Sequence, residues 1–159
     1  YMNFYTGGTG ANAERMRIDS SGHLIVPHGV TLGTAMGTYV AANTLDDYEE
    51  GTWTPTVSGL TVTVGYARYT KIGDTVTFHC GITMPTTSSS TAMGIAGLPF
   101  QTQIDGGATM AYTSAGVETE GLLMQTNTTY FYTLSGVPRS QANYSGAVIR
   151  ITGMYQTAS

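Results

Sequence analysis

The chain has 159 residues, which allows one medium-sized domain or a small domain with an extended segment. Charged residues make up only 10% of it, and the six cationic ones are scattered, so no basic stripe exists to hold a nucleic-acid backbone. No apolar run approaches the roughly 20 residues that a membrane-spanning helix needs, so we expect neither nucleic-acid binding nor membrane insertion.

Uncharged residues supply the polar surface, with 28 threonines and 21 glycines in the chain. Threonine is β-branched and suits a half-exposed pleated strand, while glycine suits tight turns. No segment has the 3.6-residue periodicity of an amphipathic helix. The composition therefore predicts an all-β protein built from many short strands.

The first 42 residues contain two short strand signals around a turn. Apolar residues alternate with arginines in "ERMRID" (14–19), "DSSG" (19–22) predicts a turn, and "HLIV" (23–26) predicts the next strand. Two such strands and a glycine-rich tail bury too little surface to fold alone. The shaft-like segment 1–42 is therefore either disordered or covered by other chains, and its aliphatic residues favour cover by other chains.

The next segment, "NTLDDYEEG" (43–51), is rich in acidic residues. Thr44 precedes Asp47 by three residues, which is a capping-box spacing, and Gly51 stands where a helical turn would stop. We expect one or two turns of helix, or a tight loop, as a connector between the shaft and a globular head.

Residues 52–159 carry at least seven strand signals at a spacing typical of a β-sandwich or jelly roll. A turn at Gly73 and Asp74 divides the longest of them. The expected strands lie in 60–64, 65–84, 92–100, 108–113, 121–126, 129–134 and 146–155.

The single cysteine, Cys80, excludes an internal disulfide framework. Alternation in "TVTFHCGI" (75–82) places it on the same face as Val76, Phe78 and Ile82. It is expected to be a buried small hydrophobe rather than a nucleophile.

The stretches 14–24, 43–56, 69–78, 97–100 and 151–155 resemble, in this order, the distal part of tail fibres of tailed bacteriophages. "ERMRIDSSGHL" (14–24) looks like a stretch common in such fibres, and "NTLDDYEEGTWTPT" (43–56) resembles the connector that often follows it. "YTKIGDTVTF" (69–78) and "GLPF" (97–100) are similar to parts of the C-terminal globular domain, which closes with a strand like "ITGMY" (151–155). Residues 101–145 match least.

The resemblance implies a homotrimeric fibre tip, with a short intertwined β shaft followed by β-sandwich heads. It implies a place in the tail fibre of the virion, joined to upstream fibre or tail proteins. It also implies attachment to a host surface glycan or outer-membrane protein, with no enzymatic activity and no cofactor. Two alternatives remain open, a fibre-associated glycan depolymerase and a capsid decoration protein.

The acidic cluster of the connector comprises Asp46, Asp47, Glu49 and Glu50. As catalytic carboxylates these residues would need partners across a cleft, and sequence neighbours rarely face one another that way. They lack the alternating pattern of a calcium loop. We favour a solvated collar that points outward from a trimer axis, with no bound metal.

Trp53 and the three histidines each allow two interpretations. Trp53 either stacks on a sugar or anchors the base of the head, and we favour the anchor. His23, His28 and His79 either form a metal site on a trimer axis or are unliganded polar side chains, which we favour.

The candidate receptor-binding residues lie mainly in the least matched region, where a receptor surface should vary. Tyrosine offers an apolar ring and a hydroxyl at a low entropy cost. The candidates are Tyr112, Tyr130, Tyr132, Arg139 and Tyr144. The loops expected at the exposed tip are 86–90, 102–108 and 137–146.

Overall fold

The computed structural model describes residues 1–5, 14–31, 44–45, 47–117, 121–125, 128–131 and 138–157. These residues form antiparallel strands and one short 3₁₀ helix, with no α-helix among them, so the expected all-β class is confirmed. The chain divides into two compact units, Tyr1–Tyr48 and Glu49–Ser159, which are described separately below as the N-terminal unit and the head. The division falls within the expected connector.

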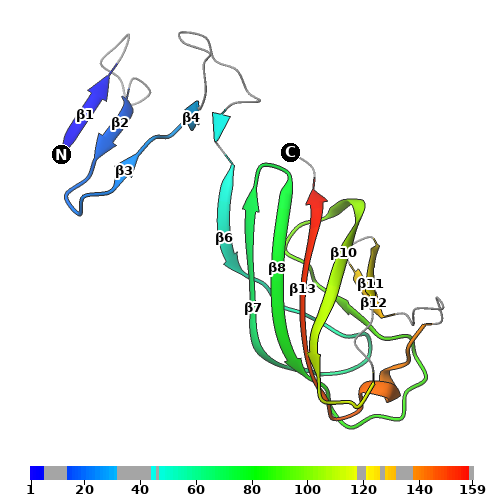
Figure 1. The fold of residues 1–159 in the computed structure, drawn as a ribbon. Helices are drawn as coiled ribbons and strands as arrows, with labels where there is room; N and C mark the ends of the chain where they lie inside the picture. The colour runs from blue at the N-terminus through cyan, green and yellow to red at the C-terminus, as the bar shows by residue number, and fades with distance from the viewer. Residues whose placement is uncertain are drawn as a thin grey trace. The chain divides into compact units, whose positions relative to one another are not determined.

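The N-terminal unit contains two small antiparallel sheets (Figure 1). The first has the order β1-β2-β3, and the second pairs β4 with β5. Their strands are β1 (Met2–Tyr5), β2 (Glu14–Ile18), β3 (Leu24–Ile25), β4 (Val30–Thr31) and β5 (Thr44–Leu45). The strands expected around residues 14–19 and 23–26 are confirmed, whereas β1 was missed because "MNFY" has no clear alternation.

None of the described residues of the N-terminal unit is buried within this single chain. Its large apolar side chains are half-buried or exposed; Leu24, for example, is 59% exposed. The unit therefore has no hydrophobic core of its own among the residues described.

The described residues of the connector, 44–45 and 47–51, are mostly strand and do not form the expected helical turn. Thr44 and Leu45 belong to β5, and the following residues form β6 (Tyr48–Thr52). One isolated helical turn fixes several dihedral angles for very few hydrogen bonds, whereas β6 gains a ladder by pairing with its neighbour β7. The capping-box spacing of Thr44 and Asp47 was therefore misleading.

The head is built on one eight-stranded antiparallel sheet with the order β6-β7-β8-β13-β10-β11-β12-β9 (Figure 1). β13 lies at its centre, between β8 and β10. The strands beyond β6 are β7 (Thr63–Ile72), β8 (Thr75–Thr83), β9 (Gly94–Ala96), β10 (Thr102–Thr113), β11 (Gly121–Gln125), β12 (Thr128–Phe131) and β13 (Val148–Thr157). The expected turn between β7 and β8 is confirmed, and Gly73 adopts a φ of 59° there.

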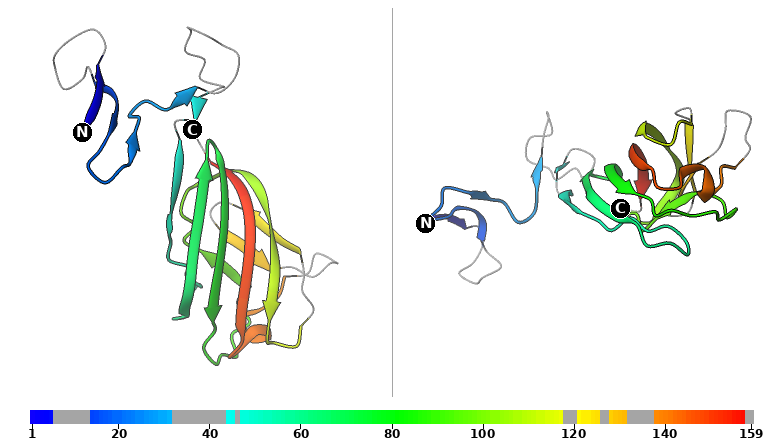
Figure 2. Two further views of the ribbon diagram at one scale, coloured as in Figure 1. Left: turned by 60° about the vertical axis from the view of Figure 1, so that its left-hand side comes forward. Right: turned by 90° about the horizontal axis from the view of Figure 1, so that it is seen from below.

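The sheet curls until its two ends are linked. Thr56 follows the first strand of the sheet order and exchanges two backbone hydrogen bonds, of 3.0 and 2.8 Å, with Ala96 in the last. The view from below in Figure 2 shows the curl. Because of it, residues of distant strands share one core, as the two layers of a sandwich would.

The core of the head follows the period-two alternation of its strands. Val76, Phe78, Cys80 and Ile82 of β8 are all buried, as the sequence predicts. Ile149 and Ile151 of β13, Met110 of β10 and Met124 of β11 join them in one cluster. Phe78 lies at its centre, with Trp53 edge-on at 5.7 Å between ring centroids and Tyr155 tilted at 6.0 Å.

Two of the three expected surface loops are not simple exposed loops. Residues 102–108 belong to β10, where a Cβ on Gly106 would meet the backbone oxygen of Met154 at 2.6 Å, so glycine permits the close approach of β13. The segment 137–146 contains the 3₁₀ helix η3 (Gln141–Tyr144), whose two end residues are buried. Residues 86–90 form an irregular segment, as expected.

Candidate ligand-binding surface

The acidic residues of the connector do not converge on an ion site in the part of the chain that the structure describes. Glu49 and Glu50 are exposed on β6, Asp47 is half-buried, and Asp46 lies outside the described residues. Glu49 accepts a short hydrogen bond from the Tyr69 hydroxyl on the neighbouring strand β7. That bond raises the pKa of Tyr69, and burial and the negative charge of Glu49 act in the same direction.

Trp53 is buried within the head, with 8% of its surface exposed. Its ring packs edge-on against Phe78, and its backbone N–H donates to the carbonyl of Ala67 at 3.3 Å. The indole face is therefore not available to stack on a sugar, and the residue anchors the segment after β6 to the core.

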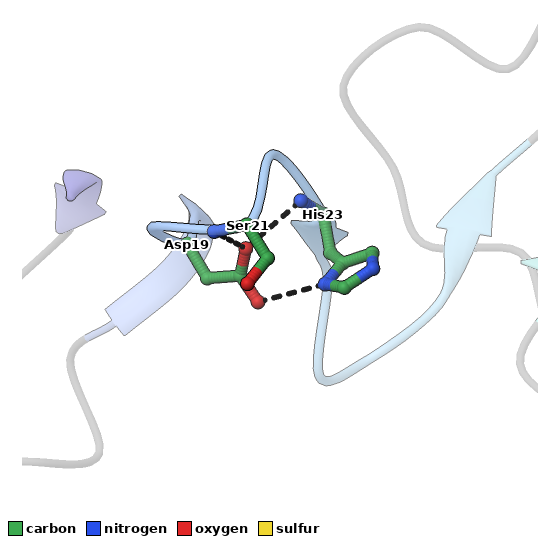
Figure 3. Close-up of polar contacts among 3 residues, drawn as sticks. All are labelled: Asp19, Ser21 and His23. Atoms are coloured by element: carbon green, nitrogen blue, oxygen red, sulfur yellow. Dashed lines mark hydrogen bonds and ion pairs between the residues drawn. The ribbon is translucent and has the colours of Figure 1, made fainter.

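The histidines have separate environments. His23 closes the turn after β2: its backbone N–H donates to Asp19 Oδ1 at 2.9 Å, and its Nδ1 lies 3.0 Å from Asp19 Oδ2 (Figure 3). Ser21 donates its backbone N–H to the same Oδ1 at 2.8 Å. His28 is exposed elsewhere in the N-terminal unit, whereas His79 belongs to β8 of the head. No cluster suited to a metal ion occurs among the described residues.

The five receptor-binding candidates do not come together in the described structure. Tyr144 is completely buried, so its predicted role as a surface contact is wrong; in η3 it shares a face with Gln141, because residues three apart eclipse in a 3₁₀ helix. Arg139 is half-buried, Tyr130 is described only as part of the β12 backbone, and Tyr132 lies outside the described residues. Tyr112 alone is a clearly exposed tyrosine of the set, at 46%.

Tyr112 belongs to an aromatic and cationic row across the outer face of the sheet. Cross-strand register places Tyr66 of β7 opposite Gly81 of β8, Gly81 opposite Arg150 of β13, and Arg150 opposite Tyr112 of β10. The Arg150 guanidinium lies 5.2 Å from the centroid of the Tyr112 ring. The Tyr66 ring lies over Gly81, where an added Cβ would come within 2.6 Å of it.

The next row on the same face adds two further groups that can carry positive charge. Arg68 of β7 pairs with His79 of β8, which pairs with Thr152 of β13. The rings of Tyr66 and His79 lie 5.9 Å apart between centroids. The two rows therefore combine two aromatic rings with two arginines and a histidine, in a chain whose net charge is −4.

The outer face is hollowed in two places. A hollow of about 210 Å³ lies over Gly81, between Tyr66 and Arg150. A second, wider groove of about 470 Å³ is lined by Glu50, Gly51, Thr52, Arg68, Tyr69, Thr70 and His79. Beside these depressions, Gly51 and Gly81 let the rings of Tyr69 and Tyr66 lie close to the backbone, because an added Cβ would come within 2.9 and 2.6 Å of those side chains.

Sequence reasoning missed Tyr66, Arg68, His79 and Arg150 as members of one surface. Alternation alone indicates that each points away from the core, since Ala67, Cys80 and Ile151 beside them point inward. Their grouping depends on which strands are neighbours and on the irregularity between Val64 and Tyr66, which shifts the register. Neither can be read from one sequence.

The chain matches no protein-family model, no curated protein and no solved structure. Within the described residues, no helix is long and apolar enough to cross a membrane. The description of the surface therefore depends on its own geometry and chemistry.

Proposed function

We propose that the chain is the tip segment of a bacteriophage tail fibre, a homotrimer whose N-terminal unit forms a shaft and whose heads attach to a host surface glycan or outer-membrane protein. The same proposal includes three further points: the heads are β-sandwiches, the protein is part of the virion, and it is attached to upstream fibre or tail proteins. The ordered set of tail-fibre-like motifs at 14–24, 43–56, 69–78 and 151–155 supports it.

The observation that carries the proposal is the contrast between the two units. The head has a core in which Phe78, Met93 and Ile95 are fully buried, whereas no described residue of the N-terminal unit is buried. The N-terminal unit also has a groove of about 470 Å³ lined by Leu24, Val26, Pro27, Gly29, Val30, Leu45 and Tyr48. Exposed apolar surface of this kind marks a contact with other chains.

A trimer, which the tail-fibre resemblance implies, covers this surface with copies of the same chain. Most soluble homo-oligomers are closed and symmetric, and winding three copies also pairs strand edges that would otherwise be open. Low charge and abundant threonine and glycine allow the chains to approach closely.

Sedimentation equilibrium of the full chain tests the assembly. One chain has a mass of 16.8 kDa, so a trimer has 3 × 16.8 = 50.4 kDa. We expect the trimer mass, together with protection of residues 14–31 from proteases. A folded monomer whose N-terminal unit resists proteolysis would overturn the proposal.

Attachment is tested by adding the fluorescently labelled full chain to a panel of bacterial strains. We expect it to bind the surface of some strains and to be displaced by the polysaccharide extracted from them. Release of oligosaccharides during the incubation would instead favour a depolymerase, and binding to no strain would contradict the attachment role.

A further inference from the structure

We propose that the hollow over Gly81, between Tyr66 and Arg150, is a binding site for one acidic sugar residue of the hexuronate type. The inference rests on the proposed attachment function and names the chemical class of ligand that the head would recognise. It depends on three features of the hollow: its size, the cation at its edge, and the ring that forms one wall.

The size of the hollow suits a single sugar ring. Its volume of about 210 Å³ is below the ~300 Å³ at which pockets for drug-sized ligands begin. Gly65 and Gly81 form its floor, Tyr66 stands on one side and Arg150 on the other. A Cβ on Gly81 would meet the Tyr66 ring at 2.6 Å, so glycine at this position lets the ring lie close to the backbone at the edge of the hollow.

The cation at the edge favours a negatively charged ligand. Arg150 stacks over the Tyr112 ring, which holds the guanidinium at the surface by a cation–π contact. A guanidinium presents a planar fork of donors that matches a carboxylate with two hydrogen bonds. No carboxylate of the described side chains forms an ion pair with Arg150. The guanidinium can therefore take its anion from a ligand.

The neighbouring groups strengthen this preference. Arg68 and His79 lie in the adjacent row, and the outward positions described on β7, β8 and β13 carry no acidic residue. The strands around the hollow thus carry cationic and no acidic groups on this face, in a chain whose net charge is −4, whereas Glu50 of the next strand, β6, lines the groove beside Arg68 and His79. Such a surface attracts anionic ligands and repels other acidic surfaces.

The aromatic wall favours a sugar. Tyr66 is 41% exposed, and its ring lies on the backbone at Gly81 and close to His79, so its orientation is fixed. An aromatic ring that is fixed in this way presents an apolar face to C–H groups while its hydroxyl stays in water. A pyranose offers both kinds of surface, and Thr83 adds a hydroxyl to the lining of the hollow.

The test is calorimetric titration of the full chain with tetragalacturonate and with its methyl ester. The two probes have the same rings and differ in charge. We expect the free acid to bind at least tenfold more tightly than the ester. Arg150→Ala should weaken binding of the acid roughly 10- to 100-fold and remove the preference, because a hydrogen-bonded charge partner is lost. Arg150→Lys, which keeps only the charge, should lie between them.

Two further variants separate the ring from the charge. Tyr66→Ala should weaken binding of the acid and of the ester to the same extent, and Gly81→Ala should do likewise by displacing the Tyr66 ring. Arg15→Ala, which removes the same charge from the N-terminal unit, serves as the matched control and should bind as the unmodified chain does. Mass and thermal unfolding are compared first, so that each titration is made on an intact protein.

Three results would overturn the inference: no preference of the unmodified chain for the acid, unchanged binding in Arg150→Ala, or a change of oligomeric mass in Arg150→Ala. The last would mean that the face is a contact between copies. Binding of Arg150→Ala to bacterial cells at the unmodified level would leave the attachment role intact and reject only this site. Failure of the unmodified chain to bind any cells would reject the attachment role, while the titration still decides the site.

Discussion

Individual residues of the head are held by close packing around Phe78. Gly153 of β13 faces this ring, and a Cβ added there would lie 2.5 Å from one ring carbon and 2.8 Å from the Cβ of Ala108. Phe78 is completely buried and has no room to move aside. Glycine is therefore required by the packing at this position, not by the backbone conformation.

We expect Gly153→Ala to lower the free energy of unfolding of the head by about 1–3 kcal/mol, because overpacking forces neighbouring side chains off their preferred rotamers. Gly107 of β10 pairs with Met154 of β13 and has open space where its Cβ would be. Gly107→Ala is therefore the matched control and should change stability little. Urea denaturation of both variants checks the difference. Equal stability of the two would show that the core is less tightly packed than described.

Cys80 provides a second prediction at the residue scale. Burial raises the pKa of its thiol to about 12, so at pH 8 almost none of it is the reactive thiolate. We expect the native protein to react with a disulfide reagent at pH 8 only on the timescale of unfolding, and to react within seconds in guanidinium chloride. Rapid reaction of the native protein would contradict the buried position.

At the scale of elements, the turn after β2 is held by one carboxylate. Asp19 accepts backbone hydrogen bonds from Ser21 and His23 and contacts the His23 ring (Figure 3). The backbone bond from His23 lowers the pKa of Asp19 most, followed by the side-chain contact with the same residue. The turn is thus most stable while Asp19 is ionised.

Since the folded pKa of Asp19 is lower than its ordinary value of 3.8, this stabilisation is complete above that value and is lost as the pH falls through the folded pKa. We expect the amide signals of Ser21 and His23 to shift with Asp19 in an NMR titration below pH 4. Asp19→Asn should remove the titration, whereas Ser20→Ala in the same turn should preserve it. A titration of Asp19 above 3.8 would refute the assignment.

Sequence patterns predicted the elements whose signal is local. Alternation identified the buried face of β8, and the glycine at 73 identified the β7–β8 turn. Sequence patterns failed to predict the secondary structure where pairing with a neighbouring strand decides it. The end of the connector forms β6 because it pairs with β7. Residues 102–108 are part of β10 because Gly106 lets β13 approach closely. The candidate site was the least predictable part, because Tyr66, Gly81 and Arg150 lie on three different strands and become neighbours only through the register in which these strands pair.

At the scale of the whole molecule, the two units are expected to respond differently to the same kind of change. Leu24→Asp places a charge on the exposed apolar surface of the N-terminal unit, where Leu24 is 59% exposed in the single chain. We expect it to convert the trimer into monomers while the thermal unfolding of the head is unchanged. Ile72→Asp, at a head position that is 53% exposed, is the matched control and should remain trimeric. A trimeric Leu24→Asp variant of normal stability would argue against the shaft.

The central place of β13 has a consequence for how the head is made. β13 is the last strand of the head in the chain, yet it fills the gap between β8 and β10. In a chain growing on the ribosome, the facing edges of β8 and β10 therefore stay unpaired until β13 emerges. Acquisition of the native head must therefore wait for β13, which postpones any association between folded heads until this strand has been made.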